Sequence, residues 1–250
     1  MNGKKKLLVI INPISGVGKQ RTVEKALTSY LDHNSYDYEI EYTQYAHHAQ
    51  SIAKEACESG RCHIIVAVGG DGSVNDVASG IVAAQSDMPM AIIPCGSGNG
   101  LARHLRIPLS VRKAIEVINV GYCQKIDTIT MNDHTYVSIA GIGFDALVAH
   151  KFSTTQTRGL QAYTEVILSE YPFYKPSLYK LNIDGKEMER EAFFISFANS
   201  NQFGYNAVVA PSANLSDGLI DVCIVDLIPI IHLPIIAHLV LARKFDLSKH

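Results

Sequence analysis

With 250 residues, the chain is long enough for one large domain or two small ones with a sizeable core. Hydrophobic residues make up 47% of it and charged residues 18%, as in ordinary folded proteins, and the net charge of −2 gives no electrostatic footprint for DNA or RNA. The five cysteines show neither C-x-x-C spacing nor partnered histidines, which argues against a zinc site and favours free thiols in a reducing cytoplasm.

Strands and helices alternate over the first half of the chain. Short, continuous β-branched runs predict buried parallel strands, and the segments between them have helical periodicity. We expect strands at 6–11, 38–43, 63–68 and 89–94, and helices at 20–31, 47–58, 74–84, 98–105 and 111–120. This order is typical of βαβ units. Residues 1–125 are therefore predicted to form an α/β domain with a parallel sheet.

Strand-like runs follow one another in the second half. We expect strands at 125–131, 135–140, 178–183, 191–198 and 219–225, with a single helix at 152–169. Asn132-Asp133 and Asp184-Gly185 are turn dipeptides, and the second is a strong hairpin signal. Residues 126–250 are therefore predicted to form a second domain, a mainly antiparallel β-sandwich.

The apolar segment at 219–242 contains Asp221, Asp226, Pro229 and Pro234. A membrane-spanning helix needs about 20 mostly apolar residues, and an aspartate inside the bilayer is costly. We therefore expect no transmembrane span, but a strand followed by an apolar helix at 227–242 that packs inside the protein or lies at a membrane interface.

Two glycine-rich turns follow the strands expected at 63–68 and 89–94. They read Gly69-Gly70-Asp71-Gly72-Ser73 and Cys95-Gly96-Ser97-Gly98-Asn99. Glycine lets the main chain approach a ligand closely, and the free N–H groups at the start of the next helix attract anions. The carboxyl ends of parallel strands share one edge of a sheet, where ligands bind. We therefore expect a phosphate site that contains an acid, Asp71.

Several polar residues near these turns have two interpretations each. Asp71 can bind magnesium or accept a proton, or it can be a turn residue bonded to local backbone. Ser73, Asn75 or Asp76 is expected to cap the following helix. Ser97 and Asn99 can contact a nucleotide or cap their own turn, and Arg103 can reach a phosphate or be solvated.

The turn after the first strand, Asn12-Pro13-Ile14-Ser15-Gly16, is either a main-chain contact to a nucleotide or a plain strand-to-helix turn. Gly18-Lys19 does not make a P-loop, because no glycine lies five residues earlier and Gln20 replaces the required Ser or Thr. Further along the chain, three aspartates have apolar neighbours in the sequence, which is typical of partnered carboxylates: Asp127, Asp145 and Asp217.

Together these motifs resemble the diacylglycerol kinase catalytic-domain family, which includes bacterial soluble lipid kinases, sphingosine kinases and ceramide kinases. The resemblance covers nearly the whole chain, with five motifs in the same order. The matching segments are Asn12–Gly16, with Thr43 at the end of the second strand, Gly69–Asp76, Pro94–Asn99, Gly141–Ala146 and Pro211–Asp221.

The resemblance implies an α/β domain followed by a β-sandwich, with ATP and the lipid headgroup meeting in the cleft. It implies that Asp71 is the catalytic acid and that Asp145, Arg158 and Arg103 contact the substrate. It further implies a magnesium site at Asn214, Asp217 and Leu219, the first and third through backbone carbonyls. The implied nucleotide contacts are Asn12, Pro13, Ser15, Gly16, Thr43, Gly69, Gly70, Gly72, Ser73, Asn75, Gly96, Ser97 and Asn99.

The chain departs from the family pattern in two places. Asn99-Gly100-Leu101-Ala102-Arg103 is closer to sphingosine kinases than to the N-D-F-A-R of bacterial diacylglycerol kinases. The D-G-E near the C-terminus of family members, whose Glu is the proposed proton acceptor, does not occur, and Asp184-Gly185-Lys186 does not replace it. We therefore expect the second domain to be incomplete at its C-terminus, or the activity to be weakened.

The expected function is that of an ATP- and Mg²⁺-dependent lipid kinase acting on a diacylglycerol or a sphingoid base. Such a protein is expected to be cytoplasmic and peripherally associated with a membrane surface that holds its lipid substrate. The sequence is compatible with a homodimer and does not determine the oligomeric state. One alternative is a kinase of a soluble substrate such as NAD, which shares the G-G-D-G motif. The other is an inactive remnant that binds a nucleotide or a lipid.

Overall fold

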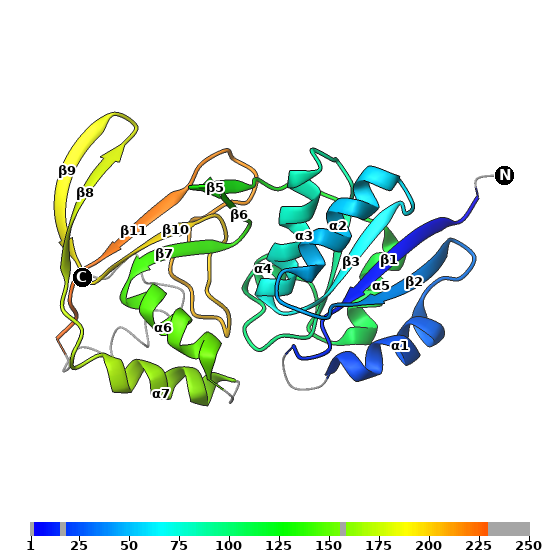
Figure 1. Cartoon of the computed structure of the whole chain (residues 1–250), viewed down its shortest axis with the longest axis horizontal. Helices are drawn as coiled ribbons and strands as arrows, with labels where there is room; N and C mark the ends of the chain where they lie inside the picture. The colour runs from blue at the N-terminus through cyan, green and yellow to red at the C-terminus, as the bar shows by residue number, and fades with distance from the viewer. Residues whose placement is uncertain (1–2, 16–18, 156–158, 230–250) are drawn as a thin grey trace. The chain divides into compact units, whose positions relative to one another are not determined.

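The computed structural model describes residues 3–15, 19–155 and 159–229 (Figure 1). The chain divides into two compact units, Met1–Val137 and Ser138–His250. Residues 126–137 thus group with the first unit, whereas the expected boundary lies before them. Each unit has its own hydrophobic clusters.

The first unit contains a parallel sheet with the strand order β2-β1-β3-β4. Strand β1 is 0–1% exposed from Leu7 to Ile11, because helices cover both of its faces. Burial on both faces explains the continuous apolar runs that predicted the strands. The elements of this α/β layer are β1 (Lys5–Ile11), η1 (Lys19–Thr22), α1 (Val23–Tyr30), β2 (Tyr36–Tyr42), α2 (His48–Ser59), β3 (Ile64–Gly69), α3 (Asp71–Ala83), β4 (Met90–Pro94), α4 (Gly100–His104) and α5 (Val111–Val120).

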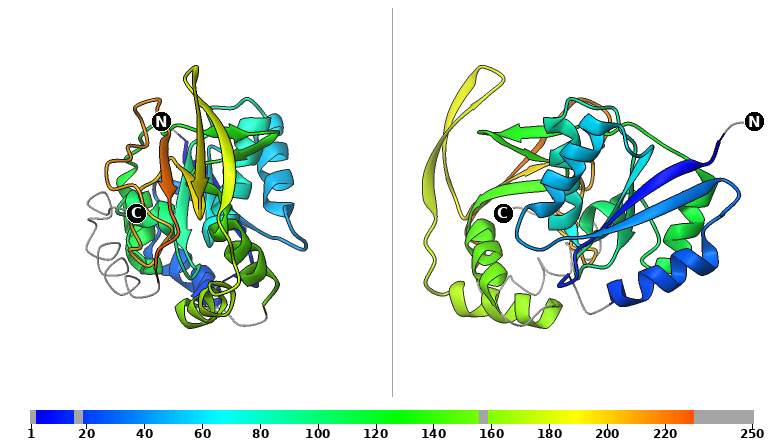
Figure 2. Two further views of the ribbon diagram at one scale, coloured as in Figure 1. Left: turned by 90° about the vertical axis from the view of Figure 1, so that its left-hand side faces the viewer. Right: turned by 45° about the vertical axis from the view of Figure 1, so that its right-hand side comes forward.

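Helices α1 and α5 cover one face of this sheet, and helices α2 and α3 pack together over the other (Figure 2). The first face is a cluster in which Leu7, Val9 and Ile11 of β1 meet the apolar sides of α1 and α5. Alternation along a strand sends Leu8 and Ile10 to the opposite face. The predicted parallel α/β domain is therefore confirmed.

Helix α3 begins earlier than the sequence suggested. Its first residue is Asp71 and its N-cap is Gly70, so Ser73, Asn75 and Asp76 lie inside the helix. The expectation that one of these three caps the helix is wrong. The glycine turn is short enough for the helix to start directly behind strand β3, which places Asp71 in the first helical turn.

A short hairpin, β5 (Ile129–Met131) and β6 (His134–Tyr136), completes the first unit. Asn132 in its turn has φ 50°, the left-handed region that asparagine tolerates better than most residues. The strand expected at 125–131 is therefore shorter than predicted. The segment expected as one strand at 135–140 is divided between β6 and a strand of the second unit.

The second unit is antiparallel and β-sandwich-like, as expected. Strands β7 (Ile139–Gly143), β10 (Phe194–Ala198) and β11 (Asp221–Val225) form a sheet with the order β11-β10-β7. Strands β8 (Ser177–Ile183) and β9 (Lys186–Ala192) pair as the predicted hairpin, with Asp184 and Gly185 at φ 50° and 82° in its turn. The run expected as one strand at 191–198 is divided between β9 and β10.

Two helices, α6 (Phe144–Thr154) and α7 (Leu160–Glu170), lie between β7 and β8. The single helix expected at 152–169 is therefore wrong. Helix α6 starts directly after Gly143, and Phe144 packs in an aromatic cluster with Tyr171 and Phe193. This packing involves residues far apart in the sequence, and the helical periodicity of the segment itself is weak. The start of α6 was therefore not predicted. The apolar helix expected at 227–242 falls mostly outside the described residues, and none of the described helices is both long and apolar enough to cross a membrane.

Candidate active site

The turns singled out in the sequence follow neighbouring strands of the parallel sheet. Thr43 follows β2 and donates its N–H to Ile11 at 2.9 Å, and Asn12 follows β1 and donates its N–H to Val68 at 3.2 Å. Cys95, after β4, donates its N–H to Gly69 of β3 at 2.8 Å. All four strands run in the same direction, so these turns lie along one carboxyl edge, as predicted.

The two glycine turns touch through their main chains. A Cβ atom at Gly96 would lie 2.2 Å from Cα of Gly70, and one at Gly70 would lie 3.1 Å from Cα of Gly96. A side chain at Gly96 would therefore overlap with backbone, which cannot move aside as the end of a flexible side chain can. The glycines are required here for the approach of one turn to the other.

Asp71 links the two turns. Its carboxylate accepts N–H groups of Asn99, Gly100 and Leu101 at the start of α4, the last at 3.4 Å. Burial raises the pKa of this carboxyl, while these main-chain donors act in the opposite direction. The acid expected in the phosphate site is thus half-buried and is fixed to the second glycine turn.

The first turn of α3 provides main-chain donors beside this carboxylate. The first N–H bonded within the helix is that of Val74, which donates to Gly70 at 3.1 Å. The N–H groups of Gly72 and Ser73 therefore precede the intrahelical pattern, at the positive end of a 13-residue helix. Such an end fits a phosphate group.

Polar side chains from the turn after β1 converge on the same helix end. Asn12 donates its Nδ2 to Oγ of Ser73 at 3.2 Å and accepts the N–H of Ile14 at 3.1 Å through Oδ1. The Ser15 hydroxyl donates to the Asn12 carbonyl at 3.1 Å. Pro13 lies within this turn, and Gly16 lies outside the described residues. The structure thus brings together the residues predicted at the first and second motifs.

The second glycine turn is held by its own side chains. Asn99 has φ 53°, is 5% exposed, and bonds both the N–H and the carbonyl of Gly96, at 3.0 and 2.7 Å. Arg103 donates its Nε to the carbonyl of Gly98 at 2.9 Å. Ser97 lies between these braced glycines. Both Asn99 and Arg103 therefore shape the turn, whatever else they contact.

A further pair at this edge was missed in the sequence. Nδ1 of His47, the N-cap of α2, lies 2.9 Å from Oδ1 of Asp76 on α3. The sequence alone predicts Asp76 only as a possible cap of its helix. A separation of 29 positions gives no local signal for such a pair, and only the packing of α2 against α3 reveals it.

In the second unit, Asp145 lies in the first turn of α6. It accepts the N–H of Ala146 at 2.7 Å and the hydroxyl of Ser196, itself 0% exposed, at 3.2 Å. A Cβ atom at Gly141 would lie 2.0 Å from its Oδ2, so this carboxylate occupies the space that a side chain would need. Burial raises the pKa of Asp145 to about 6. Arg158, its expected partner in substrate binding, lies outside the described residues.

The expected magnesium residues lie in the loop before β11. Asn214 accepts the N–H of Ser216 at 3.1 Å, and Asp217 accepts the N–H of Leu219 at 3.0 Å. Burial and the negative charge of Asp217 raise the pKa of Asp221. Two neighbouring carboxylates, Asp217 and Asp221, are oxygen groups of the kind that a hard divalent cation takes as ligands, as backbone carbonyls are.

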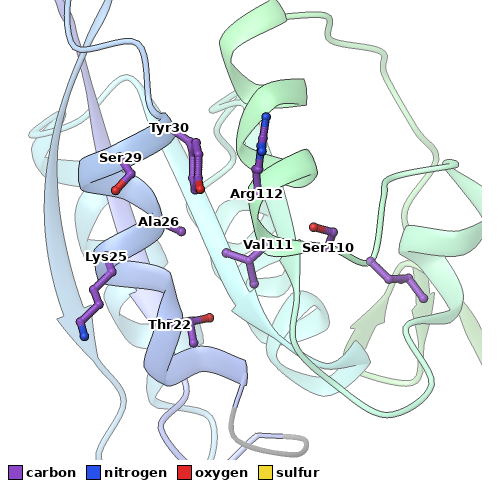
Figure 3. A pocket seen from close by; sticks show the side chains of 9 residues that line it. Thr22, Lys25, Ala26, Ser29, Tyr30, Ser110, Val111 and Arg112 are labelled. Carbon is purple, nitrogen blue, oxygen red and sulfur yellow. The ribbon is translucent and has the colours of Figure 1, made fainter.

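A separate cavity of about 470 Å³ lies between α1 and the start of α5 (Figure 3). The Arg112 guanidinium lies 4.9 Å from the centre of the Tyr30 ring at its wall. The cavity has no carboxylate among its lining residues. It lacks the acid that phosphoryl chemistry needs, so we place the candidate site at the glycine turns.

Comparison with known proteins agrees with this geometry. Residues 6–131 match the family model of the diacylglycerol kinase catalytic domain, and residues 138–237 match that of the YegS C-terminal NAD kinase beta sandwich-like domain. The chain belongs to the diacylglycerol kinase catalytic-domain family. The resemblance inferred from the five motifs is thereby confirmed.

Relatives of this family member carry lipid kinase names. A diacylglycerol kinase of Mycobacterium tuberculosis is 28% identical over 87% of this chain and 72% of its own length. A probable lipid kinase YegS-like of Pseudomonas putida is 30% identical over 90% of this chain and 75% of its own length. A crystal structure of a putative diacylglycerol kinase from Bacillus anthracis covers 98% of this chain and 82% of its own, with a TM-score of 0.73 and 23% identity, and shares the fold.

Proposed function

We propose that this protein is an ATP-dependent lipid kinase that transfers the γ-phosphate to a hydroxyl group of a diacylglycerol or a sphingoid base. The observation that supports this most directly is the carboxylate of Asp71, held between two glycine turns whose main chains touch. Phosphoryl transfer requires mainly positioning and neutralisation of charge, which main-chain donors and one acid can supply.

In this proposal, the triphosphate lies on the carboxyl edge of the parallel sheet. Main-chain N–H groups at Gly72 and Ser73 and the polar side chains of the first turn contact the phosphates. Thr43, at the end of β2, contacts the nucleoside portion. The remaining proposed contacts are Asn12, Pro13, Ser15, Gly16, Gly69, Gly70, Gly96, Ser97 and Asn99. The amide of Asn75 is engaged by the main chain of Thr135 and Val137 instead.

Asp71 has the central chemical role in the proposal. Its raised pKa means that it binds a proton more readily than an exposed aspartate does, which suits a group that receives the proton of an attacking hydroxyl. The amides of residues 99–101 fix the direction in which its carboxylate points. Magnesium, when bound, would supply positive charge to the phosphates, and Asn214, Asp217 and Leu219 would hold a second, structural ion.

The acceptor is proposed to be held by the second unit. Asp145 has a pKa of about 6, so it is mostly ionised at neutral pH and can accept a hydrogen bond from a lipid hydroxyl or pair with the amine of a sphingoid base. Arg158 and Arg103 are proposed to assist it. A lipid acceptor places the protein at a membrane surface, so we propose a cytoplasmic protein that associates peripherally with membranes.

The proposal is tested by transfer of labelled phosphate from ATP to dioleoylglycerol or sphingosine in mixed micelles. We expect Asp71→Asn, which keeps the shape of the side chain, to reduce transfer by about 10²- to 10⁴-fold. Nucleotide binding by calorimetry serves to show that the variant is folded. Asp37→Ala, at an exposed aspartate paired with Lys4, is the control and should keep full activity.

Two outcomes would contradict the proposal. Undiminished turnover by a folded Asp71→Asn variant would remove Asp71 from the chemistry. Transfer to NAD in place of either lipid would assign the same motif to a kinase of a soluble substrate.

A further inference from the structure

The side chain of Asn75 is bonded to the main chain of residues 135–137. Its Nδ2 donates to the carbonyl of Thr135 at 3.0 Å, and its Oδ1 accepts the N–H of Val137 at 3.1 Å. Ser79, one helical turn further along α3, donates to the same Thr135 carbonyl at 3.2 Å. Both halves of the Asn75 amide are thus bonded to consecutive peptide groups, 135–136 and 136–137, of one chain segment.

These bonds hold the last residues of the first unit. The unit ends at Val137, which is 2% exposed. The next residue, Ser138, is held by the second unit, because its carbonyl accepts the N–H groups of Asn199 and Ser200 at 2.9 and 3.0 Å. The Ser138 hydroxyl also pairs with the Ser200 hydroxyl at 2.7 Å. The peptide bond at 137–138 is therefore fixed on both sides.

Asn75 stands on the helix whose first turn carries the glycine motif. Helix α3 begins at Asp71, so Asn75 follows that residue by about one helical turn. The intrahelical hydrogen bonds make this turn a stiff connection. The end of the first unit is thereby fixed to the part of α3 that faces the proposed phosphate site.

We propose that Asn75 is a positioning residue that clamps the connection between the two units to helix α3, and that it is not a nucleotide ligand. The inference rests on the proposed function, in which a phosphate held by the first unit reacts with a hydroxyl held by the second. A loosely held connection would let the distance between the reacting atoms vary. A misplacement of about 1 Å can reduce the rate about a hundredfold. The clamp therefore acts on kcat and leaves nucleotide affinity unchanged.

The first unit contains a matched control for this clamp. Asn119 on α5 donates its Nδ2 to the carbonyl of Tyr30 at 2.8 Å and accepts the N–H of Asp32 at 2.9 Å. It thus makes the same pair of bonds to consecutive peptide groups, at a place away from the glycine turns and from the end of the unit. Asn75→Ala and Asn119→Ala remove equivalent interactions and differ only in location.

The experiment compares wild type, Asn75→Ala and Asn119→Ala in the full chain. We would measure the Kd for ADP by calorimetry, kcat and KM for dioleoylglycerol in mixed micelles, and amide hydrogen exchange at residues 135–138. For Asn75→Ala we expect exchange at Val137 to accelerate about tenfold or more, as the loss of one hydrogen bond allows. We also expect kcat to fall about tenfold or more, with the Kd for ADP within about twofold of wild type. Asn119→Ala should change none of the three.

Three outcomes would overturn the clamp. A large loss of ADP affinity in Asn75→Ala would make Asn75 a nucleotide ligand. A kcat equal to that of Asn119→Ala, or unchanged exchange at Val137, would show that the connection is held by other contacts. If wild type transfers phosphate to no lipid, the proposed function fails, while hydrogen exchange and ADP affinity still decide whether the clamp exists.

Discussion

Among single residues, two half-buried aspartates show how burial and hydrogen bonds together set the pKa of an acid. Asp71 is partnered by three main-chain N–H groups, and Asp145 by one N–H group and the hydroxyl of Ser196. In both, burial is the largest influence and raises the pKa. The sequence marked both residues through their motifs and apolar neighbours. Except for Ala146, which is adjacent to Asp145, their partners lie 28–51 positions away and only the fold supplies them.

The raised pKa of Asp145 makes stability depend on pH. Its folded-state pKa of about 6 exceeds the ordinary value of 3.8, so the folded chain binds the proton more tightly than the unfolded chain does. The resulting contribution to the free energy of unfolding is complete below about pH 4 and is lost as the pH rises through 6. At 1.36 kcal/mol per pKa unit, it amounts to about 2–3 kcal/mol.

Asp145→Asn should therefore remove most of this dependence. Between pH 4.5 and pH 7.5, the second unit of the variant should lose less stability than the second unit of wild type. The measurement is amide exchange of peptides from that unit at the two pH values, corrected for intrinsic rates. Asp184→Asn, in the exposed turn of the β8–β9 hairpin, is the control and should follow wild type. An Asp145→Asn profile that also follows wild type would mean that the carboxyl does not titrate between these values.

Among the elements, the two glycine turns act together, because their main chains are in contact. Each follows a strand of the parallel sheet, and the contact between Gly70 and Gly96 sets how closely the starts of α3 and α4 approach. This proximity lets Asp71 on one helix accept the amides of the other. The sequence predicts each turn separately, because glycine after a β-branched run is a local signal.

The contact between the turns leads to a prediction for two alanine substitutions. Gly96→Ala would place a Cβ atom 2.2 Å from the Gly70 backbone, so we expect a loss of about 3 kcal/mol in the free energy of unfolding and much weaker ADP binding. Gly72→Ala meets no atom within 4 Å and lies inside α3, so we expect it to be neutral or to stabilise by up to about 1 kcal/mol. Urea unfolding of the two variants is the measurement. Equal stabilities would refute the steric role of Gly96.

In the whole molecule, the two units have separate cores. Leu27 and Ile115 belong to the cluster of the first unit, whereas Phe144 and Phe193 belong to an aromatic cluster of the second. The division at Val137 falls where the clamp of Asn75 ends. The length of 250 residues is compatible with two units, but the sequence did not assign the β5–β6 hairpin to the first unit.

Separate cores predict separate responses to a cavity. Phe193 is 2% exposed, and Phe193→Ala should lower the stability of the second unit by about 3–5 kcal/mol. Hydrogen exchange should accelerate in peptides of 138–229 and stay as in wild type in the parallel sheet, and the Kd for ADP should be unchanged. Acceleration of equal size in β1 and β3 would show that the two units unfold as one.

The sequence by itself determined the class of each half, the parallel strands, the carboxyl edge and the family. These features depend on local signals, namely continuous apolar runs between helical periods and glycines at fixed offsets, and such signals persist in any fold that uses them. It failed where packing decides, at the start of α3 and at the division of one expected helix into α6 and α7. Only the tertiary structure gave Asn75 its partners at residues 135 and 137, Asp71 its partners at the start of α4 and His47 its contact with Asp76. The reason is that a side chain bonds the polar group that folding brings nearest, irrespective of its distance along the chain.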